Sequence, residues 1–452
     1  MANDPEGPQH AAKVTEGDHP VTFRSLLALR EFRAIYASQV ISVLGDFLTR
    51  AAVTVLVYQQ THSVLLSAFS FAVVYLPNIL VGPLLATLGD RYPHRRVMIA
   101  SDLFRMALTA LLLIPGLPTA LILLVVLVAS LGTPAGQAAR SALYPLAVGR
   151  DRLTLALVTS NSTVQMAQVV GYLTGAALAV GLGPRVALGV DVATFAASVL
   201  LVAAGVQTRP GAISPERRRH LLTETAEGFR LVFGHPVLRP IAVVVLTTVA
   251  FSVVPEGLAA SWAAEATPKG IPQGIEQGLI MAAAPLGFVA GGLLFSHLVP
   301  VERRWRLLPI LAVLVPLSLV PVLPGPQGTT VAVLTALCGM AAGAALPALN
   351  AAFVLVLPLS HRARAFGVMS SGVQASQFLA VLVTGVLADH VRIPLVVASW
   401  SAVGAVAVAL IGLRWPSRER FAAAEREAAA EQATAPVPQQ PSRPAGQAEP
   451  AT

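Results

Sequence analysis

Charge is scarce in this sequence. Only 12% of its 452 residues are charged and 55% are hydrophobic, whereas a soluble domain carries about 25% charged residues. Two stretches, 106–139 and 307–360, contain no Asp, Glu, Lys or Arg at all. Each of them is long enough for two membrane spans of roughly 20 residues. The shortage of charge therefore excludes a water-soluble globular fold and predicts an all-α integral membrane protein.

Cysteine, metal-ligand clusters and enzyme motifs are missing as well. Cys338 is the only cysteine, so disulfide bonds play no part in the fold. The sequence has no His-Glu-x-x-His, Walker A or Gly-x-Ser-x-Gly motif, and its nine histidines lack metal-ligand spacing. We therefore expect no enzyme activity, no cofactor and no metal, and no ATP-driven pump within this chain. Residues 1–20 lack the order of a signal peptide and are expected to form a short disordered tail.

Breaks at proline, glycine and charge clusters divide the chain into twelve predicted membrane-spanning helices. These helices cover residues 34–58, 66–88, 97–115, 119–139, 153–180, 185–207, 238–262, 277–299, 307–323, 329–357, 365–388 and 392–413. The third and fourth are separated only by a Pro-Gly-Leu-Pro segment at 115–118. A kink in place of this break would leave an odd number of spans.

The distribution of basic residues tests this count, because cytoplasmic loops of membrane proteins are enriched in Lys and Arg. With the N-terminus inside, cytoplasmic segments hold 27 of the 31 basic residues, external loops hold three, and Arg50 lies within a span. The assignment places Arg105 and Arg140 among the cytoplasmic residues. It predicts a multi-pass protein of the cell membrane with both termini cytoplasmic. The net charge of +8 is then a consequence of topology and does not indicate a nucleic-acid partner.

An internal repeat supports an even number of helices. The pentapeptide Val-Gln-Met-Ala-Gln at 164–168 recurs as Val-Gln-Ala-Ser-Gln at 373–377, and the same dipeptides flank both copies at offsets of 209 to 213. The repeat predicts two parallel six-helix bundles related by an axis normal to the membrane. The expected units are a cytoplasmic tail (1–33), the first bundle (34–207), a cytoplasmic linker (208–237), the second bundle (238–413) and a largely disordered cytoplasmic tail (414–452). We expect this last tail to begin as a charged helix near Arg418 and then to become disordered in its Ala/Pro/Gln-rich part.

The strongest local motif lies between the second and third predicted spans, where residues 89–96 read Gly-Asp-Arg-Tyr-Pro-His-Arg-Arg. This segment resembles the signature loop of the major facilitator superfamily, Gly-x-x-x-Asp-Arg-x-Gly-Arg-Arg. Ala86 and Pro93 stand at the two glycine positions of the signature, and His94 replaces the arginine that follows the second one. The resemblance implies that Asp90 and Arg91 help to latch the cytoplasmic side closed, with Arg95 and Arg96 completing the motif. The corresponding loop of the second half keeps its arginines but lacks the aspartate.

Other segments resemble the bacterial exporter branch of the same superfamily, which includes siderophore and drug exporters. They are Gly45-Asp46 in the first span, Asp191 in the sixth, and the 227–236 region before the seventh. Together with the signature loop, this resemblance covers roughly residues 25–415. It implies the major facilitator fold, with the first, fourth, seventh and tenth spans around a central cavity.

Ionisable residues inside membrane spans are costly and usually face a cavity. Asp46 and Arg50 lie four residues apart on one face of the first span, which predicts that they form a pair. One interpretation is a buried ion pair that only orders the helix, and the other is a titratable carboxylate that couples transport to protons. Glu256 in the seventh span is either a second proton site or a polar group near the external mouth. For Asp191 we favour helix capping or interhelical bonding.

Glutamines form a further candidate set on the repeat-related spans, as i, i+3 pairs: Gln165, Gln168, Gln374 and Gln377. Hydrogen bonding between the halves is the favoured interpretation, and direct contact with a substrate is the alternative. The segment 171–175, Gly-Tyr-Leu-Thr-Gly, resembles an antiporter motif of superfamily exporters but has tyrosine where the motif has proline. It is also a small-xxx-small packing motif.

These features lead to one functional hypothesis and two alternatives. The hypothesis is a monomeric secondary transporter in the lipid bilayer, which exports a hydrophobic or amphipathic small molecule in exchange for protons by alternating access. An importer or uniporter on the same fold is the first alternative. A membrane receptor or scaffold that no longer transports is the second, although the retained Asp90 and intramembrane acids disfavour it.

Overall fold

The computed structural model describes residues 22–80, 92–209, 221–265, 271–357 and 361–434, and these form helices without any strand. An all-helical fold satisfies every backbone hydrogen bond within the segment, as a bilayer requires. The helices are α1 (Phe23–Leu27), α2 (Arg30–Thr61), α3 (Val64–Ala72), the 3-10 turn η1 (Val73–Tyr75), α4 (Leu76–Leu80), α6 (His94–Leu111), α7 (Thr119–Ser130), α8 (Gly132–Val148), α9 (Arg150–Gly181), α10 (Pro184–Gly205), α11 (Leu221–Gly234), α12 (Leu238–Ser252), α13 (Val254–Glu265), α14 (Gln273–Leu298), α15 (Val301–Leu317), the turn η3 (Val320–Val322), α16 (Gly328–Leu355), α17 (Arg362–Ala388), α18 (Ile393–Gly412) and α19 (Arg418–Thr434).

Ten helical spans among the described residues are long and apolar enough to cross a membrane. Two predicted spans fall outside this set. The second is described only as the shorter run Val64–Leu80, and the third is α6, which contains four charged residues. Between α6 and α7 the chain breaks as expected, because Gly116 adopts a left-handed φ of 78°. The count of twelve and the repeat remain predictions.

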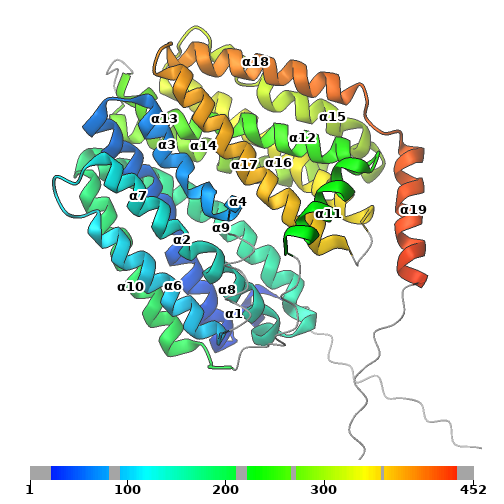
Figure 1. Cartoon of the computed structure of the whole chain (residues 1–452), viewed down its shortest axis with the longest axis horizontal. Helices are drawn as coiled ribbons and strands as arrows, with labels where there is room; N and C mark the ends of the chain where they lie inside the picture. Colours follow the sequence, from blue (N-terminus) through cyan, green and yellow to red (C-terminus); the bar gives the residue numbers. More distant parts are fainter. Residues whose placement is uncertain (1–21, 81–91, 210–220, 266–270, 358–360, 435–452) are drawn as a thin grey trace, which may run out of the picture.

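The helices form two bundles, α1–α10 and α11–α18, which we call the N-half and the C-half (Figure 1). We call the end that contains α1 and the starts of α2, α9 and α17 the terminal end. The opposite end, where α2 passes into α3 and α9 into α10, is the loop end. Extensive contacts join α9 to α14 and α3 to α17, and smaller ones join α13 to α2 and α3. These contacts link the halves toward the loop end, while the terminal ends of the two bundles diverge (Figure 1).

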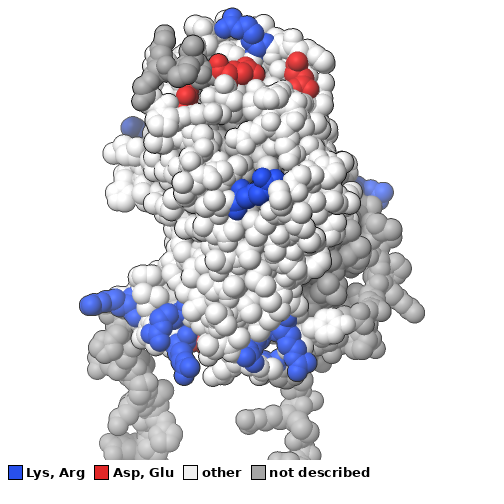
Figure 2. Space-filling model, turned by 90° about the vertical axis from the view of Figure 1, so that its left-hand side faces the viewer, with Lys and Arg blue, Asp and Glu red and all other residues white. Residues whose placement is uncertain are grey.

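The surface charge follows the same axis. Figure 2 shows most of the basic side chains at the terminal end, and most of the acidic side chains at the loop end together with a smaller basic group. Between the two ends lies a broad belt in which charged side chains are few, with one basic patch near the middle of this face. Such a belt matches the hydrocarbon region of a bilayer, where exposed charges are costly.

Glycines allow the halves to approach closely at the loop end. A Cβ atom on Gly274 of α14 would lie 2.7 Å from the Ala176 carbonyl oxygen of α9, and one on Gly278 would lie 3.0 Å from the Leu173 Cα. Membrane helices associate through such small-residue packing because lipid tails offer no hydrophobic driving force. The α9–α14 interface therefore depends on these two glycines.

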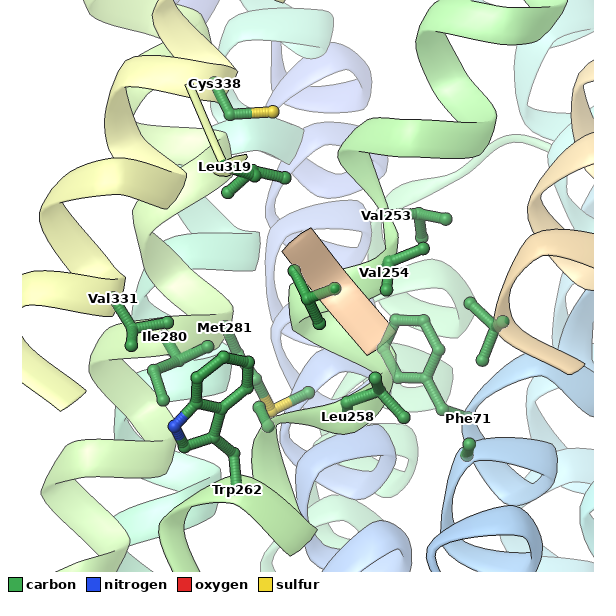
Figure 3. Close-up of a cluster of buried hydrophobic side chains, with 14 of the residues drawn as sticks. Phe71, Val253, Val254, Leu258, Trp262, Ile280, Met281, Leu319, Val331 and Cys338 are labelled. Carbon is green, nitrogen blue, oxygen red and sulfur yellow. The ribbon is translucent and has the colours of Figure 1, made fainter. Parts of the chain in front are cut away.

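An apolar cluster fills the space beside this interface (Figure 3). Phe71 of the N-half packs among C-half side chains that include Leu258, Trp262 and Met281, and all four are at least 94% buried. The chain breaks between α12 and α13 at Val253, and Pro255 lies in the first turn of α13, where its missing N–H is tolerated. The cluster closes the loop end between the two bundles.

A helix follows the second bundle. α19 extends from Arg418 to Thr434, in the part of the tail where a charged helix was expected. The ring of Phe421 lies 4.3 Å from that of Trp305, and Trp305 also contacts Trp415. Aromatic packing therefore attaches α19 to the C-half. Residues 435–452 lie outside the described residues.

Candidate functional site

A cavity of about 480 Å³ lies in the N-half and reaches the boundary with the C-half. Its wall comes mainly from α2, α8 and α9, α6 contributes Arg105, and Gln374 of α17 comes from the C-half. Five residues with charged side chains line it: Asp46, Arg50, Arg105, Arg140 and Asp191. A membrane-embedded cavity with this many ionisable groups is the main candidate for substrate and ion binding.

The Asp46 carboxylate forms an ion pair with Arg105 of α6. The sequence had predicted that Asp46 pairs with Arg50. This prediction is wrong: among the described residues, no ion pair joins Asp46 and Arg50. The Arg105 guanidinium also lies over the Phe195 ring, 4.6 Å from its centroid. Helical spacing places Asp46 and Arg50 near one another on α2, but an adjacent helix supplies the cation that binds Asp46.

Arg105 and Arg140 were assigned to cytoplasmic segments from the sequence, and the structure corrects both. Arg105 lies in the interior of α6 with 13% of its side chain exposed, and Arg140 lies within α8 with 9% exposed. Asp102, one turn before Arg105, is also buried and accepts a 2.6 Å hydrogen bond from Ser198. Arg105, Arg140 and Asp102 therefore belong to the interior of the protein. The one signal of this in the sequence is the i, i+3 spacing of Asp102 and Arg105, which places an acid and a base on the same face of α6.

Asp191 is buried in α10 and binds the neighbouring helix. It accepts a 2.6 Å hydrogen bond from Thr49 of α2 and a 2.9 Å bond from Thr194. Gly45 faces this carboxylate, and a Cβ atom there would collide with it. These contacts agree with the favoured interpretation of interhelical bonding. The carboxylate also lines the cavity and interacts electrostatically with Asp46 and Arg105.

Arg50 instead belongs to a network that crosses between the halves. Its guanidinium lies 5.1 to 5.6 Å from three aromatic ring centroids, including that of Phe71, and donates a 3.4 Å hydrogen bond to the Tyr75 hydroxyl. Glu256 of α13 is 8% exposed and accepts a 3.3 Å hydrogen bond from Tyr172 of α9. Arg50 interacts electrostatically with both Tyr172 and Glu256. A carboxylate of the C-half is thus held by a tyrosine and an arginine of the N-half.

The signature loop is only partly described. Asp90 and Arg91 lie outside the described residues, so the predicted latch remains a prediction. Arg95 donates a 2.5 Å hydrogen bond to the Ala203 carbonyl oxygen, in the last turn of α10, and a 2.7 Å hydrogen bond to the Thr208 hydroxyl, which follows that helix. This contact lies within the N-half. Arg96 is exposed at the start of α6.

The glutamine pairs do not form the expected bond between the halves in the described part of the chain. Gln165, Gln168 and Gln377 are half-buried on α9 and α17, and Gln374 lines the cavity. A glutamine that the sequence analysis overlooked makes such a bond instead. Gln277 of α14 is fully buried and donates 3.3 Å hydrogen bonds to the Ala51 carbonyl oxygen and the Thr54 hydroxyl of α2. Nothing in its sequence context distinguished it.

The glycines of segment 171–175 are packing residues. A Cβ atom on Gly171 would lie 2.8 Å from the Leu44 carbonyl oxygen, and one on Gly175 would lie 2.7 Å from the Leu48 Cα. Both contacts join α9 to α2 within the N-half. Tyr172, which stands at the proline position of the exporter motif, is the residue that binds Glu256.

Comparison with known families settles the class of the chain. A family model described as Major Facilitator Superfamily matches residues 35–324 and 270–444. The chain belongs to this superfamily. The resemblance inferred from the signature loop is thereby confirmed, and superfamily members of this kind are membrane transporters.

The curated relatives of this superfamily member include bacterial exporters. The multidrug efflux pump Tap of Mycolicibacterium fortuitum is 29% identical over 387 residues, which cover 81% of this chain and 90% of Tap. The enterobactin exporter EntS of Shigella boydii is 29% identical over 58% of this chain and 62% of its own length. Macrolide efflux protein A of Streptococcus pyogenes is 26% identical over 31% of this chain and 36% of its own.

Solved structures of superfamily transporters share the fold. A peptide transporter POT in complex with alafosfalin superimposes with a TM-score of 0.68 at 12% identity, covering 87% of this chain and 95% of that one. The nucleoside transporter NupG gives a TM-score of 0.63 at 15% identity, with 84% and 99% covered. At these identities the likeness concerns the fold alone.

Proposed function

We propose that this superfamily transporter exports a hydrophobic or amphipathic small molecule in exchange for protons by alternating access. Efflux is supported by the curated relatives, which are named as efflux pumps and exporters. Alternating access is supported by bundles that meet at the loop end and diverge at the terminal end (Figure 1). The basic terminal end corresponds to the cytoplasm under the positive-inside rule, so this conformation is open inward.

The observation that supports proton coupling is the bond between Tyr172 and Glu256 across the two halves. A buried carboxylate is stable as an anion only while donors and a cation face it. Separation of the halves at the loop end would withdraw Tyr172 and Arg50 from Glu256 and expose the carboxyl to the outside. Glu256 therefore changes its environment with the transport state, which is the requirement for exchanging a proton.

The second candidate for this role is Asp46. It lines the cavity but is bound by Arg105 within the same half. Movement of one half relative to the other leaves that pair in place. We therefore place Glu256 before Asp46 as the residue that couples proton and substrate movement, and we assign Asp46 and Asp191 to the polar lining of the cavity.

Flux in proteoliposomes with an imposed pH gradient tests this function. The probes are ethidium and 1-naphthylacetate, an amphipathic cation and anion, and the variant is Glu256→Gln, which keeps an acceptor for Tyr172 but cannot ionise. The wild type should accumulate one probe against its gradient, and Glu256→Gln should lose this response while still exchanging probe at equilibrium. Glu276→Gln, at the loop end of α14, serves as the matched control.

Four outcomes would each overturn part of the proposal. Full gradient-driven accumulation by Glu256→Gln would remove Glu256 from the coupling step, and Asp46→Asn would then be the next variant. A wild type that equilibrates either probe without responding to the pH gradient would indicate a uniporter, and the absence of any flux would indicate a receptor or scaffold. Reversal of the direction with respect to the gradient would indicate an importer.

A further inference from the structure

Arg140 is a buried arginine on the cavity wall whose donors lack an acceptor. Its Nε atom is inaccessible and has no hydrogen-bond partner among the described residues. The ion pairs that those residues form involve Arg105, Arg209 and Arg364. An arginine side chain carries five N–H donors, and leaving such donors unmet in a buried place is costly. The position therefore requires a further acceptor.

Neighbouring carboxylates do not meet this requirement. Asp102 and Asp46 interact electrostatically with Arg140, but Ser198 donates to Asp102 and Arg105 binds Asp46. Both carboxylates lie beyond ion-pair distance from the Arg140 guanidinium. They compensate part of its charge without accepting its hydrogen bonds. Arg140 thus remains able to bind an additional anionic oxygen.

Polar groups beside Arg140 present donors to the same cavity. The side-chain amide oxygen of Gln39 accepts hydrogen bonds from the Tyr144 hydroxyl and, at 2.9 Å, from the Ser160 hydroxyl. The Gln39 amide nitrogen is consequently left to donate. By contrast, the two carboxylates that line the cavity, Asp46 and Asp191, are already engaged by donors. At the part of the wall formed by Arg140 and Gln39, the vacant hydrogen-bonding groups are therefore donors, which require an acceptor from the bound molecule.

Apolar side chains complete the wall: Val43, Phe47, Val126 and Phe195. Resting on the transport function proposed above, we propose that Arg140 binds an oxyanion of the transported molecule, such as a carboxylate, through charge-assisted hydrogen bonds. The apolar part of the molecule then contacts the valine and phenylalanine side chains. This assigns the substrates to amphipathic anions and makes Arg140 a specificity-determining residue.

Binding of three probes of one shape and different charge tests the assignment. They are 1-naphthylacetate, the neutral 1-naphthylacetamide and the cation 1-naphthylmethylammonium, titrated calorimetrically into the full chain in zwitterionic nanodiscs without a pH gradient. The wild type should bind the acetate at least tenfold more tightly than the amide. Arg140→Gln should reduce this ratio to about one, and Arg140→Lys should keep part of it because the charge remains while the planar fork is lost. Arg303→Gln, an exposed arginine of α15, should leave it unchanged.

Equal binding of acetate and amide by the wild type would overturn the assignment, as would tighter binding of the cation or an undiminished preference in folded Arg140→Gln. Thermal unfolding and size-exclusion profiles establish whether each variant is folded. If Arg140→Gln does not fold, Arg140→Lys still tests the assignment. A second titration in nanodiscs that contain phosphatidylglycerol distinguishes a lipid source of the anion: loss of acetate binding there would assign the site to a lipid headgroup and also overturn the assignment. Because no gradient is used, a failure of proton coupling leaves this result untouched.

Discussion

The carboxylate of Asp389, at the end of α17, lies 2.7 Å from the backbone nitrogen of Val64, at the start of α3. The same carboxylate accepts hydrogen bonds from the Leu65 nitrogen at 3.1 Å and from the Ser63 hydroxyl. A residue of the C-half thus satisfies two unpaired N–H groups at the first turn of a helix in the N-half, where negative charge is also favoured by the helix dipole. These bonds exist only while the loop end is closed.

We therefore expect Asp389→Ala to destabilise the closed loop end. Loss of a helix cap costs about 1 kcal/mol, which corresponds to a roughly fivefold change in the ratio of closed to open molecules. Spin labels on cysteines at Leu182 and Ile271, in a Cys338→Ala background, report the separation of the halves by pulsed electron resonance. An unchanged distance distribution would show that Asp389 is not part of the closure. Glu276→Gln, an acid at the same end, is the control.

The pair between Asp46 and Arg105 should appear as a coupling energy in a double-mutant cycle. Each single change, Asp46→Asn or Arg105→Gln, leaves a partly buried charge without its partner and should lower the unfolding temperature. The double variant should be destabilised by less than the sum, with a coupling of about 0.5–3 kcal/mol. Thermal unfolding in detergent gives the stability difference between the wild type and each of the two single variants and the double variant. If the stability losses of the two single variants simply added up in the double variant, the pair would be contradicted. In the control cycle of Asp46→Asn with Arg50→Gln, the losses should be closer to additive.

Gly175 should tolerate no larger side chain. Its Cβ position lies 2.7 Å from the Leu48 Cα, so Gly175→Val forces α9 away from α2. Overpacking of this kind costs about 1–3 kcal/mol, and we expect a lower unfolding temperature and reduced yield of folded protein. Gly181→Val is the matched control on the same helix, because nothing lies within 4 Å of a Cβ atom there. Equal effects of both substitutions would show that the α2–α9 contact is not the cause.

The orientation of the chain can be tested with an impermeant thiol reagent on intact cells. In the Cys338→Ala background, a cysteine at Arg392 should react because it lies at the loop end, which the positive-inside rule places outside. Cysteines at Arg24 and Arg418, both exposed at the terminal end, should react only after the membrane is made permeable. Labelling of Arg24→Cys in intact cells would reverse the assigned orientation.

Composition and charge spacing were sufficient to predict an all-helical membrane protein. Uncharged stretches of more than 30 residues have few alternatives to spanning a bilayer, because helices satisfy the backbone there without water. The break at 115–118 was also predictable, since proline and glycine interrupt a helix through their own backbone. The superfamily followed from the signature loop even though residues 89–91 of this segment lie outside the described structure.

Tertiary structure decided which residues meet. The spacing of Asp46 and Arg50 allowed a pair on one helix, but α6 places Arg105 beside Asp46, and α3 and η1 surround Arg50 with aromatic rings. No local pattern encodes such choices, because the partners come from helices that are distant in sequence. The burial of Arg140 could not be predicted for the same reason. For an arginine near the end of a predicted span, the sequence does not distinguish a position in a cytoplasmic loop from a position in the protein interior. Only the packing of α8 against α6 and α9 removes it from water.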